Sequence, residues 1–482
     1  MNSNVGATHK EKNIYLWLTK FTNRNKKPEK TFCGTESRSL RTPSTDTTKH
    51  IATMNHPIRF TTPEEAVKVI KSGDHVHLSS VASVPQILVR AMTARGEAGE
   101  LQHVHIHHLH TEGEALYAVP EMEGIFQLDS FFVGGNVRNI TQQGFADYIP
   151  VFLSETQRLY RDGILPCNVA MIQVSTPDRH GYVSLGTSVD ATLAAVECAD
   201  TVIAVVNRHV PRSFGDSFIH TSQIDLFVED DTPLIEEHFA EPNDLECAIG
   251  RNCAALIEDG ACLQMGIGAI PNAVLSQLGS HKNLGVHTEM FADGVLPLVE
   301  SGVINGANKK IDKGKMVSTF LMGSHRVYDF IDNNPGVLMK DVGYTNDPFV
   351  IAQNPKVTAI NSALQIDLTG QICADSLGTR FYSGVGGQVD FTNPNISTLG
   401  GYIESGDVKP LAVFSDKRMD AYPDIPAFTE TVPEAEKYLN IPYTLLSFVV
   451  NNDTPQEVVD VLKAASEKVF ADPEWTAFVT PN

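Results

Sequence analysis

Short apolar runs alternate with longer amphipathic stretches along the chain from Pro57 onward. The runs have the length and β-branched character of buried strands, and the longer stretches repeat apolar residues at helical spacing. Alternation of this kind predicts βαβ units, and therefore an α/β fold built on mainly parallel sheets that are covered on both faces. The clearest expected strands are His75–Ser79, Val104–His108, Val169–Val174, Thr201–Val206 and Leu284–His287, and the clearest expected helices are Pro63–Lys71, Val84–Met92, Ala191–Ala199, Leu245–Ile257 and Pro271–Leu278.

One supersecondary pattern occurs twice. Ile70–Leu88 and Ile257–Leu275 each contain a helix end at glycine, a short apolar strand, a loop of small residues and a proline that opens the next helix. Glycine after a helix and proline at a helix start are the expected placements. The repetition predicts two similar α/β domains.

Charge divides the 482 residues further. The formal net charge of -21 separates into +6 for residues 1–53, -19 for residues 54–391 and -8 for residues 392–482. We interpret residues 1–53 as a basic, disordered leader, with Met54 as an alternative start. We expect one α/β domain over 54–240, a second over 241–391 and a separate module over 392–482, since a turn-rich link follows Phe391.

Composition excludes several classes of protein. No stretch approaches the roughly 18–20 uninterrupted apolar residues of a membrane span. The acidic balance argues against nucleic-acid binding, which needs a basic face. The seven cysteines form no CxxC pair, so we expect neither a zinc ribbon nor a disulfide framework. These features indicate a cytoplasmic protein, with a mitochondrial location as the alternative if the leader is a presequence.

A glycine loop and an acidic residue are the first candidates for chemistry. Gly266–Pro271 lies between an expected strand and helix, where backbone N–H groups can face an anion. With Glu289 about twenty residues on, a dinucleotide site is one alternative, but Pro271 occupies the position of the third glycine. A structural tight turn is the other alternative. Glu289 ends the strand that begins at Leu284, sharing a face with His287, and it could equally be a surface acid.

Two further motifs carry alternatives. Ser383–Phe391 has three glycines in four positions and is either a loop that lets a ligand approach backbone amides or a plain hairpin turn. The run from His103 to His110 would place His103, His105 and His107 on one side of a strand, with His108 and His110 on the other. No cysteine or glutamate at ligand spacing accompanies this run, so we expect structural histidines and no metal site.

Several of these segments together resemble one enzyme family. The most telling are SSVASVPQIL, QLDSFFVGGNVR, YIPVFLSETQRLY, CNVAMIQVSTPDRHGYVSLGTSVDATLAAVECAD, QMGIGAIPNAV, GVHTEMFADG and INSALQIDLTGQICADSLGTRFYSGVGGQVDF. They resemble the acetyl-CoA hydrolase/transferase branch of the class I coenzyme A transferases, of the 4-hydroxybutyrate CoA-transferase type. The resemblance runs from about His56 to Phe391 and implies two open α/β/α domains of the CoA-transferase type.

The resemblance also implies a mechanism and its residues. Glu289 would be the nucleophile, forming a glutamyl-CoA thioester while CoA passes from an acyl-CoA to a short-chain carboxylate such as acetate, 4-hydroxybutyrate or succinate. Amides of Ile267 and Gly386 would stabilise the oxyanions, with Gly268 and Gly387 in the same loops. Asn346 matches a position that flanks the nucleophile. Coenzyme A would be a substrate, with no permanently bound cofactor, and we expect a homodimer or higher homo-oligomer.

The chain departs from this family after Phe391. The strands and helices that normally complete the second domain are absent, and Gly400–Asn482 resembles the carboxyl-terminal part of Bug-type solute-binding proteins of tripartite tricarboxylate transporters, an α/β fragment. A gene fusion or a chimeric gene model would explain both features. An acyl-CoA hydrolase, in which water reaches the same Glu289 intermediate, is the first alternative function. An inactive fusion or a non-enzymatic solute-binding protein is the second.

Overall fold

A computed structural model describes residues 58–266, 268–366, 372–378 and 380–392. All of these residues fall in one compact unit of the chain. The expected leader over 1–53, Met54 and the module after residue 392 lie outside the described residues. The two described parts are called here the N-terminal half (58–240) and the C-terminal half (241–392).

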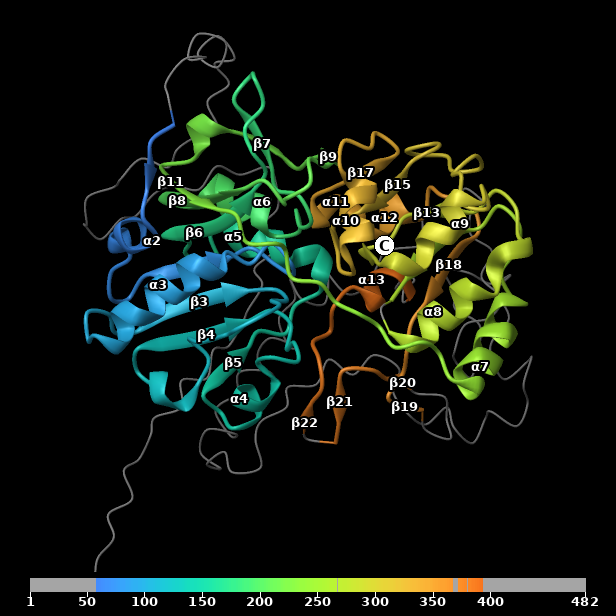
Figure 1. Ribbon diagram of the computed structural model, residues 1–482. Coiled ribbons are helices and arrows are strands. Elements are labelled where there is room, and N and C mark those ends of the chain that lie inside the picture. Colours follow the sequence, from blue (N-terminus) through green and yellow to red (C-terminus); the bar gives the residue numbers. More distant parts are fainter. Residues whose placement is uncertain (1–57, 267, 367–371, 379, 393–482) are drawn as a thin grey trace, which may run out of the picture. The chain divides into compact units, whose positions relative to one another are not determined.

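The N-terminal half is built on one parallel sheet of eight strands (Figure 1). Every neighbouring pair in this sheet runs parallel. In spatial order the strands are β1 (Phe60–Thr61), β11 (Leu226–Asp230), β8 (Thr201–Asn207), β6 (Val169–Val174), β2 (His75–Leu78), β3 (Val104–His108), β4 (Phe126–Ser130) and β5 (Ala146–Tyr148). The predicted mainly parallel α/β fold is confirmed here.

Alternate residues of β6 and β8 enter two different apolar cores. In β6, Val169 and Met171 join one core, whereas Ala170 and Ile172 join the other. This is the period of two that a strand imposes on its side chains. The first core, beneath α2 (Pro63–Ala66) and α3 (Gln86–Glu97), is confined to the N-terminal half. The second core continues into β12 (Cys262–Met265) and β13 (Gly285–Val286) of the C-terminal half, so the two halves share buried apolar surface.

The helices of the N-terminal half connect these strands. They are α2 (Pro63–Ala66), α3 (Gln86–Glu97), α4 (Arg138–Gln142), α5 (Thr156–Arg161) and α6 (Thr192–Cys198). The predicted helix Pro63–Lys71 is wrong in its second part, because a 3-10 turn replaces the α-helix from Val67 to Val69. The predicted helix Val84–Met92 begins after Pro85 and ends at Glu97, five residues later than predicted, and Thr93 and Gly96 of this extension are also buried.

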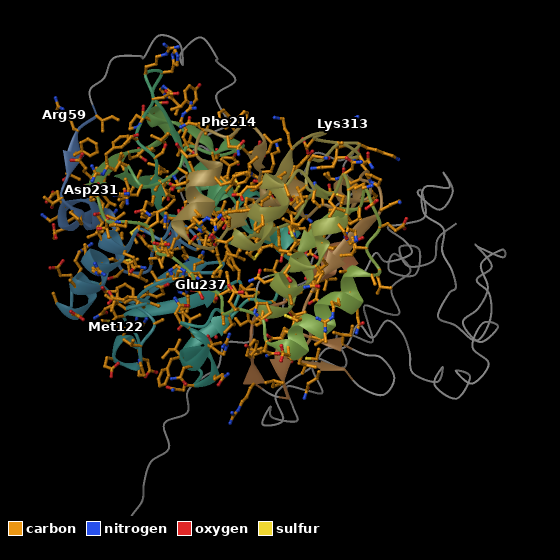
Figure 2. All side chains as sticks on the ribbon, turned by 45° about the vertical axis from the view of Figure 1, so that its right-hand side comes forward. Arg59, Met122, Phe214, Asp231, Glu237 and Lys313 are labelled. Carbon is orange, nitrogen blue, oxygen red and sulfur yellow. The ribbon has the colours of Figure 1, made fainter. Side chains whose placement is uncertain are left out.

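The C-terminal half has its strands divided among short sheets. Three parallel groups are β13-β12-β18, β14-β16 and β15-β17-β9, and β9 (Phe214–Gly215) comes from the N-terminal half. Phe214, labelled in Figure 2, pairs with Leu338. The other strands are β12 (Cys262–Met265), β13 (Gly285–Val286), β14 (Met290–Phe291), β15 (Met316–Ser318), β16 (Phe320–Leu321), β17 (Val337–Met339) and β18 (Val357–Ile360).

Helices and three antiparallel strand pairs complete the described ranges. The helices of the C-terminal half are α7 (Asp244–Ala254), α8 (Ala269–Ser276), α9 (Leu296–Glu300), α10 (His325–Ile331), α11 (Val342–Thr345), α12 (Pro348–Ile351) and α13 (Gln388–Thr392). The antiparallel pairs are β7 (Tyr182–Ser184) with β10 (Phe218–His220), β19 (Gln365–Ile366) with β20 (Ile372–Cys373), and β21 (Ser376–Leu377) with β22 (Arg380–Phe381). None of the described helices has the length and apolar character needed to span a bilayer.

Candidate active site

Glu289 lies on a segment that changes sheet partners. The segment pairs with β12 at Gly285 and Val286, and His287 then bridges to Val317 of β15. The predicted strand Leu284–His287 is therefore shorter than expected. Between these partners, the buried Thr288 hydroxyl donates to the Met265 carbonyl at 3.2 Å and accepts from the Met265 N–H at 3.0 Å. These bonds fix the backbone next to Glu289 against the end of β12.

His287 and Glu289 contact consecutive residues at the end of α11. His287 Nε2 lies 2.9 Å from the Thr345 carbonyl, and Asn346 Nδ2 donates to Glu289 Oε2 at 3.3 Å. Both side chains project toward the same element, as alternation along the strand predicts. Burial lowers the pKa of His287 to about 4, so this imidazole is neutral at pH 7 and adds no positive charge beside Glu289.

The Glu289 carboxyl is half-buried and lacks a cationic partner among the described residues. Burial raises its pKa to about 7; the hydrogen bond from Asn346 acts in the opposite direction, and the negative charge of Asp390 adds to the increase. A carboxylate that is neither paired nor fully hydrated keeps its basicity and nucleophilicity. Glu289 is therefore poised to ionise near neutral pH.

Asn346 joins Glu289 to a second carboxylate. Its side chain is fully buried, and Nδ2 also donates to Asp390 Oδ2 at 3.1 Å. Asp390, on α13, accepts from the Ser154 N–H at 3.1 Å and from the Ser154 hydroxyl at 2.8 Å. Burial raises the pKa of Asp390 as well. One amide group thus holds two carboxyls, and a serine of the N-terminal half holds one of them.

The second glycine loop packs directly against the side chains of Glu289 and Asn346. A Cβ atom on Gly387 would overlap both Glu289 Oε2 and Asn346 Nδ2, so only glycine fits there. Gly386 has a φ of +62°, a conformation that glycine adopts without strain. The loop runs from β22 to the helix α13, so the hairpin-turn alternative is wrong.

The N-terminal half anchors this loop. The Leu153 N–H donates to the Gly386 carbonyl at 3.0 Å, and the Val385 N–H donates to the Tyr148 hydroxyl at 2.8 Å. The Arg138 guanidinium donates to the Tyr382 carbonyl at 2.6 Å and lies 4.2 Å from the centre of the Tyr382 ring. The loop that contacts Glu289 is therefore positioned by residues that are distant from it in sequence.

The first glycine loop lies at the end of β12. Ile267 falls outside the described residues. Gly268 precedes α8 with a φ of +106°, and Gly266 donates its N–H to the Ile360 carbonyl at 2.9 Å. Met265, which precedes Gly266, is hydrogen-bonded to Thr288, which precedes Glu289, so the loop begins beside the segment that carries Glu289. The strand β12, the loop and the helix α8 follow one another in this order. Both the dinucleotide site and the structural tight turn require this order, so it does not decide between them.

Sequence reasoning missed three members of this arrangement. Asp390 belongs to the segment GGQVDF, but its contact with Asn346 had no signal in the sequence. Ser154 and Tyr148 lie in YIPVFLSETQRLY, a segment whose only signal was the family resemblance. The contacts of Ser154 with Asp390 and of Tyr148 with Val385 each join residues more than 230 positions apart in the chain. Asp390 and Asn346 are 44 positions apart.

The histidine run differs in part from its predicted arrangement. His103 precedes β3 with a φ of +54° and is exposed, so it does not share the strand face of His105 and His107. His108 is buried on the opposite face, and His110 Nε2 lies 2.6 Å from Glu112 Oε1.

Family comparisons match separate parts of the chain. Residues 45–236 match the acetyl-CoA hydrolase/transferase N-terminal domain, and residues 323–402 match the corresponding C-terminal domain. Residues 379–482 match the tripartite tricarboxylate transporter family receptor, in agreement with the resemblance of the carboxyl-terminal segment.

Curated relatives cover the same region. A succinyl-CoA:acetate/propanoyl-CoA:succinate CoA transferase of Fasciola hepatica is 46% identical over 70% of this chain and 70% of its own length. The 4-hydroxybutyrate coenzyme A transferase of Clostridium kluyveri is 46% identical over 69% of this chain and 77% of its own. An acetyl-CoA hydrolase of Neurospora crassa is 26% identical over 46% of this chain and 50% of its own.

Solved structures agree with these relatives. RipA from Yersinia pestis superposes with a TM-score of 0.63 at 34% identity, covering 66% of this chain and 74% of RipA. A 4-hydroxybutyrate CoA-transferase from Porphyromonas gingivalis gives a TM-score of 0.58 at 38% identity, covering 65% and 75%. The chain is thus an enzyme of the acetyl-CoA hydrolase/transferase family, and the two relatives named above at 46% identity are CoA transferases.

Proposed function

We propose that this protein transfers CoA from an acyl-CoA to a short-chain carboxylate of the acetate, 4-hydroxybutyrate or succinate type, through a glutamyl-CoA thioester on Glu289. The observation that carries the proposal is the state of Glu289, a half-buried carboxyl with a pKa near 7, in contact with Asn346 and closely covered by Gly387. The CoA transferases among the relatives support the same reaction class.

The first half-reaction moves CoA onto the enzyme. A Glu289 oxygen attacks the thioester carbonyl carbon, the C–S bond breaks, and a mixed anhydride and CoA thiolate form. The thiolate then attacks the glutamyl carbonyl carbon of the anhydride, which releases the first carboxylate and leaves Glu289 as its CoA thioester. This covalent route retains the energy of the thioester.

The second half-reaction reverses these events with a new acid. The incoming carboxylate attacks the glutamyl thioester, which gives a second anhydride and free thiolate. The thiolate attacks the acyl carbonyl carbon, so a new acyl-CoA leaves and the Glu289 carboxylate returns. Each addition places a negative charge on a carbonyl oxygen, and we assign its stabilisation to the amides of Ile267 and Gly386.

Two neighbouring side chains would position the nucleophile. Asn346 donates to Glu289 Oε2 and so orients the carboxylate, and Asp390 fixes Asn346 from the other side. Because Asp390 is held by Ser154, the N-terminal half contributes to this positioning.

The hydrolase alternative differs only in the last acceptor, since water would open the anhydride or the thioester. The assay therefore follows two quantities with acetyl-CoA as donor: propanoyl-CoA formed when propanoate is added, and free CoA released when no acid is added. A transferase forms propanoyl-CoA faster than it releases CoA. Faster CoA release without an acceptor would instead assign the hydrolase.

Glu289→Gln tests the nucleophile. We expect at least a thousandfold loss of exchange, because the amide cannot form the anhydride. Mass spectrometry of the wild-type protein with acetyl-CoA should find CoA attached at Glu289 and nothing at this residue in the variant. Glu258→Gln, an exposed acid paired with Lys356, is the control and should exchange normally. Exchange that survives in Glu289→Gln overturns the assignment, and a wild-type protein without exchange or hydrolysis supports the inactive fusion.

A further inference from the structure

Three adjacent strands of the N-terminal half display imidazoles and a carboxylate on one face of the sheet. Val76, Ile106 and Leu128 point into the core beneath α2 and α3. The alternate positions therefore face the other way; they are His75 and His77 on β2, His105 and His107 on β3, and Asp129 on β4. The parallel register sets His75 beside His105, and His107 beside Asp129.

Four of these side chains converge. His105 Nδ1 lies 2.7 Å from Asp129 Oδ2, and His107 Nε2 lies 3.4 Å from the same oxygen. His75 Nδ1 lies 3.0 Å from His107 Nε2. One ligand atom from each of His75, His105 and Asp129 lies within 4.8 Å of the other two. Zn²⁺–N bonds of about 2.0–2.1 Å in a tetrahedral site separate the ligand atoms by about 3.3 Å, so small side-chain shifts would bring these atoms onto one ion.

Hydrogen bonding within the protein leaves this group incompletely satisfied. The His75 and His105 rings stack with their centres 4.4 Å apart, and two ring nitrogens of His75 and His107 face each other. A neutral imidazole has one N–H and one lone pair, so two facing nitrogens share at most one proton when both rings are neutral. The other nitrogen of the fully buried His107, Nδ1, has no hydrogen-bond partner among the described residues. A cation would replace the single proton between the facing nitrogens of His75 and His107 and engage both lone pairs.

Access and charge also favour a cation. The His105 side chain is 30% exposed and Asp129 is 12% exposed, so an ion and a water ligand can enter from solvent. Asp147, exposed on β5, is paired in register with Asp129 and adds a second negative charge. His77 is not available as a ligand, because its two nitrogens contact the Tyr160 hydroxyl and the Thr192 hydroxyl.

We propose that His75, His105 and Asp129, supported by His107, bind one divalent first-row transition ion of the Zn²⁺ type. Two imidazoles and a carboxylate are donors that Zn²⁺ and Co²⁺ accept, with the remaining position open to water or to His107. The site uses none of the residues assigned to CoA transfer, so it stands or fails independently of the proposed function.

Direct metal binding tests the site. The full chain is stripped with a chelator and titrated with Co²⁺, whose visible absorption reports coordination by imidazole, and bound Co²⁺ is then displaced with Zn²⁺. We expect the wild-type chain to bind one more equivalent than His105→Gln does, with affinity in the variant at least a hundredfold lower. His103→Asn is the matched control, since His103 is exposed beside the same strand and asparagine tolerates its positive φ.

A second variant separates binding from folding. His75→Asn removes a different donor from another strand and should lose the same equivalent of Co²⁺. The urea midpoint of each metal-free variant verifies that it folds. Equal Co²⁺ binding by the wild type and both folded variants overturns the proposal, as does a wild-type chain that binds no Co²⁺.

Discussion

The two halves of the molecule hold a carboxyl group in opposite ways. Burial of Asp129 alone would raise its pKa, but contacts with His105 and His107 outweigh that effect and lower it to about 2. Burial raises the pKa of Glu289 to about 7, and its neighbours are an amide and another carboxyl. Asp129 is therefore a stabilised anion, whereas Glu289 ionises at a cost to the fold.

This difference teaches which carboxyl can act as a nucleophile. Asp129 is stabilised as an anion by the hydrogen bonds from His105 and His107, so it is a poor nucleophile. Such a carboxylate is suited to ordering a sheet, or to binding a cation in place of the histidine protons. A carboxyl without a cation is destabilised when ionised, and reaction with an electrophile removes that charge. The continuous sheet of the N-terminal half places Asp129 beside the histidines that stabilise it. The C-terminal half, with its short sheets, places Glu289 between segments drawn from both halves.

After the loss of exchange in Glu289→Gln, the next largest effect is expected from filling the space beside Glu289. Gly387→Ala would force the glycine loop away from Glu289 Oε2 and Asn346 Nδ2, and we expect about a hundredfold loss of kcat for CoA exchange. Gly279→Ala is the control, because its Cβ meets nothing within 4 Å and its φ is ordinary. An active Gly387→Ala variant would show that the loop does not define the nucleophile's environment.

A smaller effect, a loss of folding stability, is expected from substituting Asp129, the carboxylate that is paired with two histidines. Asp129→Asn removes the charge that binds His105 and His107, and it should lower the free energy of unfolding by about 2 kcal/mol in chelator-treated protein at pH 7. Urea unfolding measures this change. The adjacent Asp147→Asn, on an exposed side chain, should change the value by less than about 0.5 kcal/mol. Equal effects of the two substitutions would contradict the contrast drawn between Asp129 and Glu289.

Glu289→Gln should raise the free energy of unfolding, whereas Asp129→Asn lowers it. Because the folded pKa of Glu289 exceeds its unfolded value of 4.5, folding takes up protons between pH 4.5 and pH 7, and the stability of the wild type falls as pH rises through that window. Glutamine does not titrate, so the variant should be more stable by about 1–2 kcal/mol at pH 8, with no difference below pH 4.5. Urea midpoints at both ends of the range decide the sign. A less stable variant at pH 8 would mean that Glu289 is a stabilised anion after all.

The smallest effect concerns the charge behind Asn346. Asp390→Asn removes a negative charge that raises the pKa of Glu289, and asparagine can still accept from the Ser154 N–H while donating to its hydroxyl. The acidic limb of kcat/KM should move to lower pH by less than about one unit. The control Glu258→Gln should leave the profile in place. A shift to higher pH would show that Asp390 does not act through its charge.

Much of the fold followed from local patterns. The strands over Val104–His108 and Val169–Val174 have the predicted bounds, because their apolar alternation or continuity already specifies a buried strand. The Gly266–Pro271 loop was expected between a strand and a helix; β12 does end at Met265, but α8 already begins at Ala269, so the last three residues of the predicted loop are helical. Glu289 was a candidate from its place at a strand end, together with the family resemblance. The shortened strand at Gly285 was not predictable, because its partner changes from β12 to β15.

The sequence by itself determined the α/β class and the two glycine loops, since periodicity and glycine spacing are local properties, and its family resemblance supplied Glu289 as the candidate nucleophile. Only the tertiary structure decided that Ser154 and Tyr148 hold the second loop, and that Asn346 lies between Glu289 and Asp390. The tertiary structure also brings His75 and Asp129 close to His105, and the run of histidines in the sequence did not indicate this cluster. The physical reason is that a pKa and a ligand set depend on groups brought together through space, whereas the sequence records only their order along the chain.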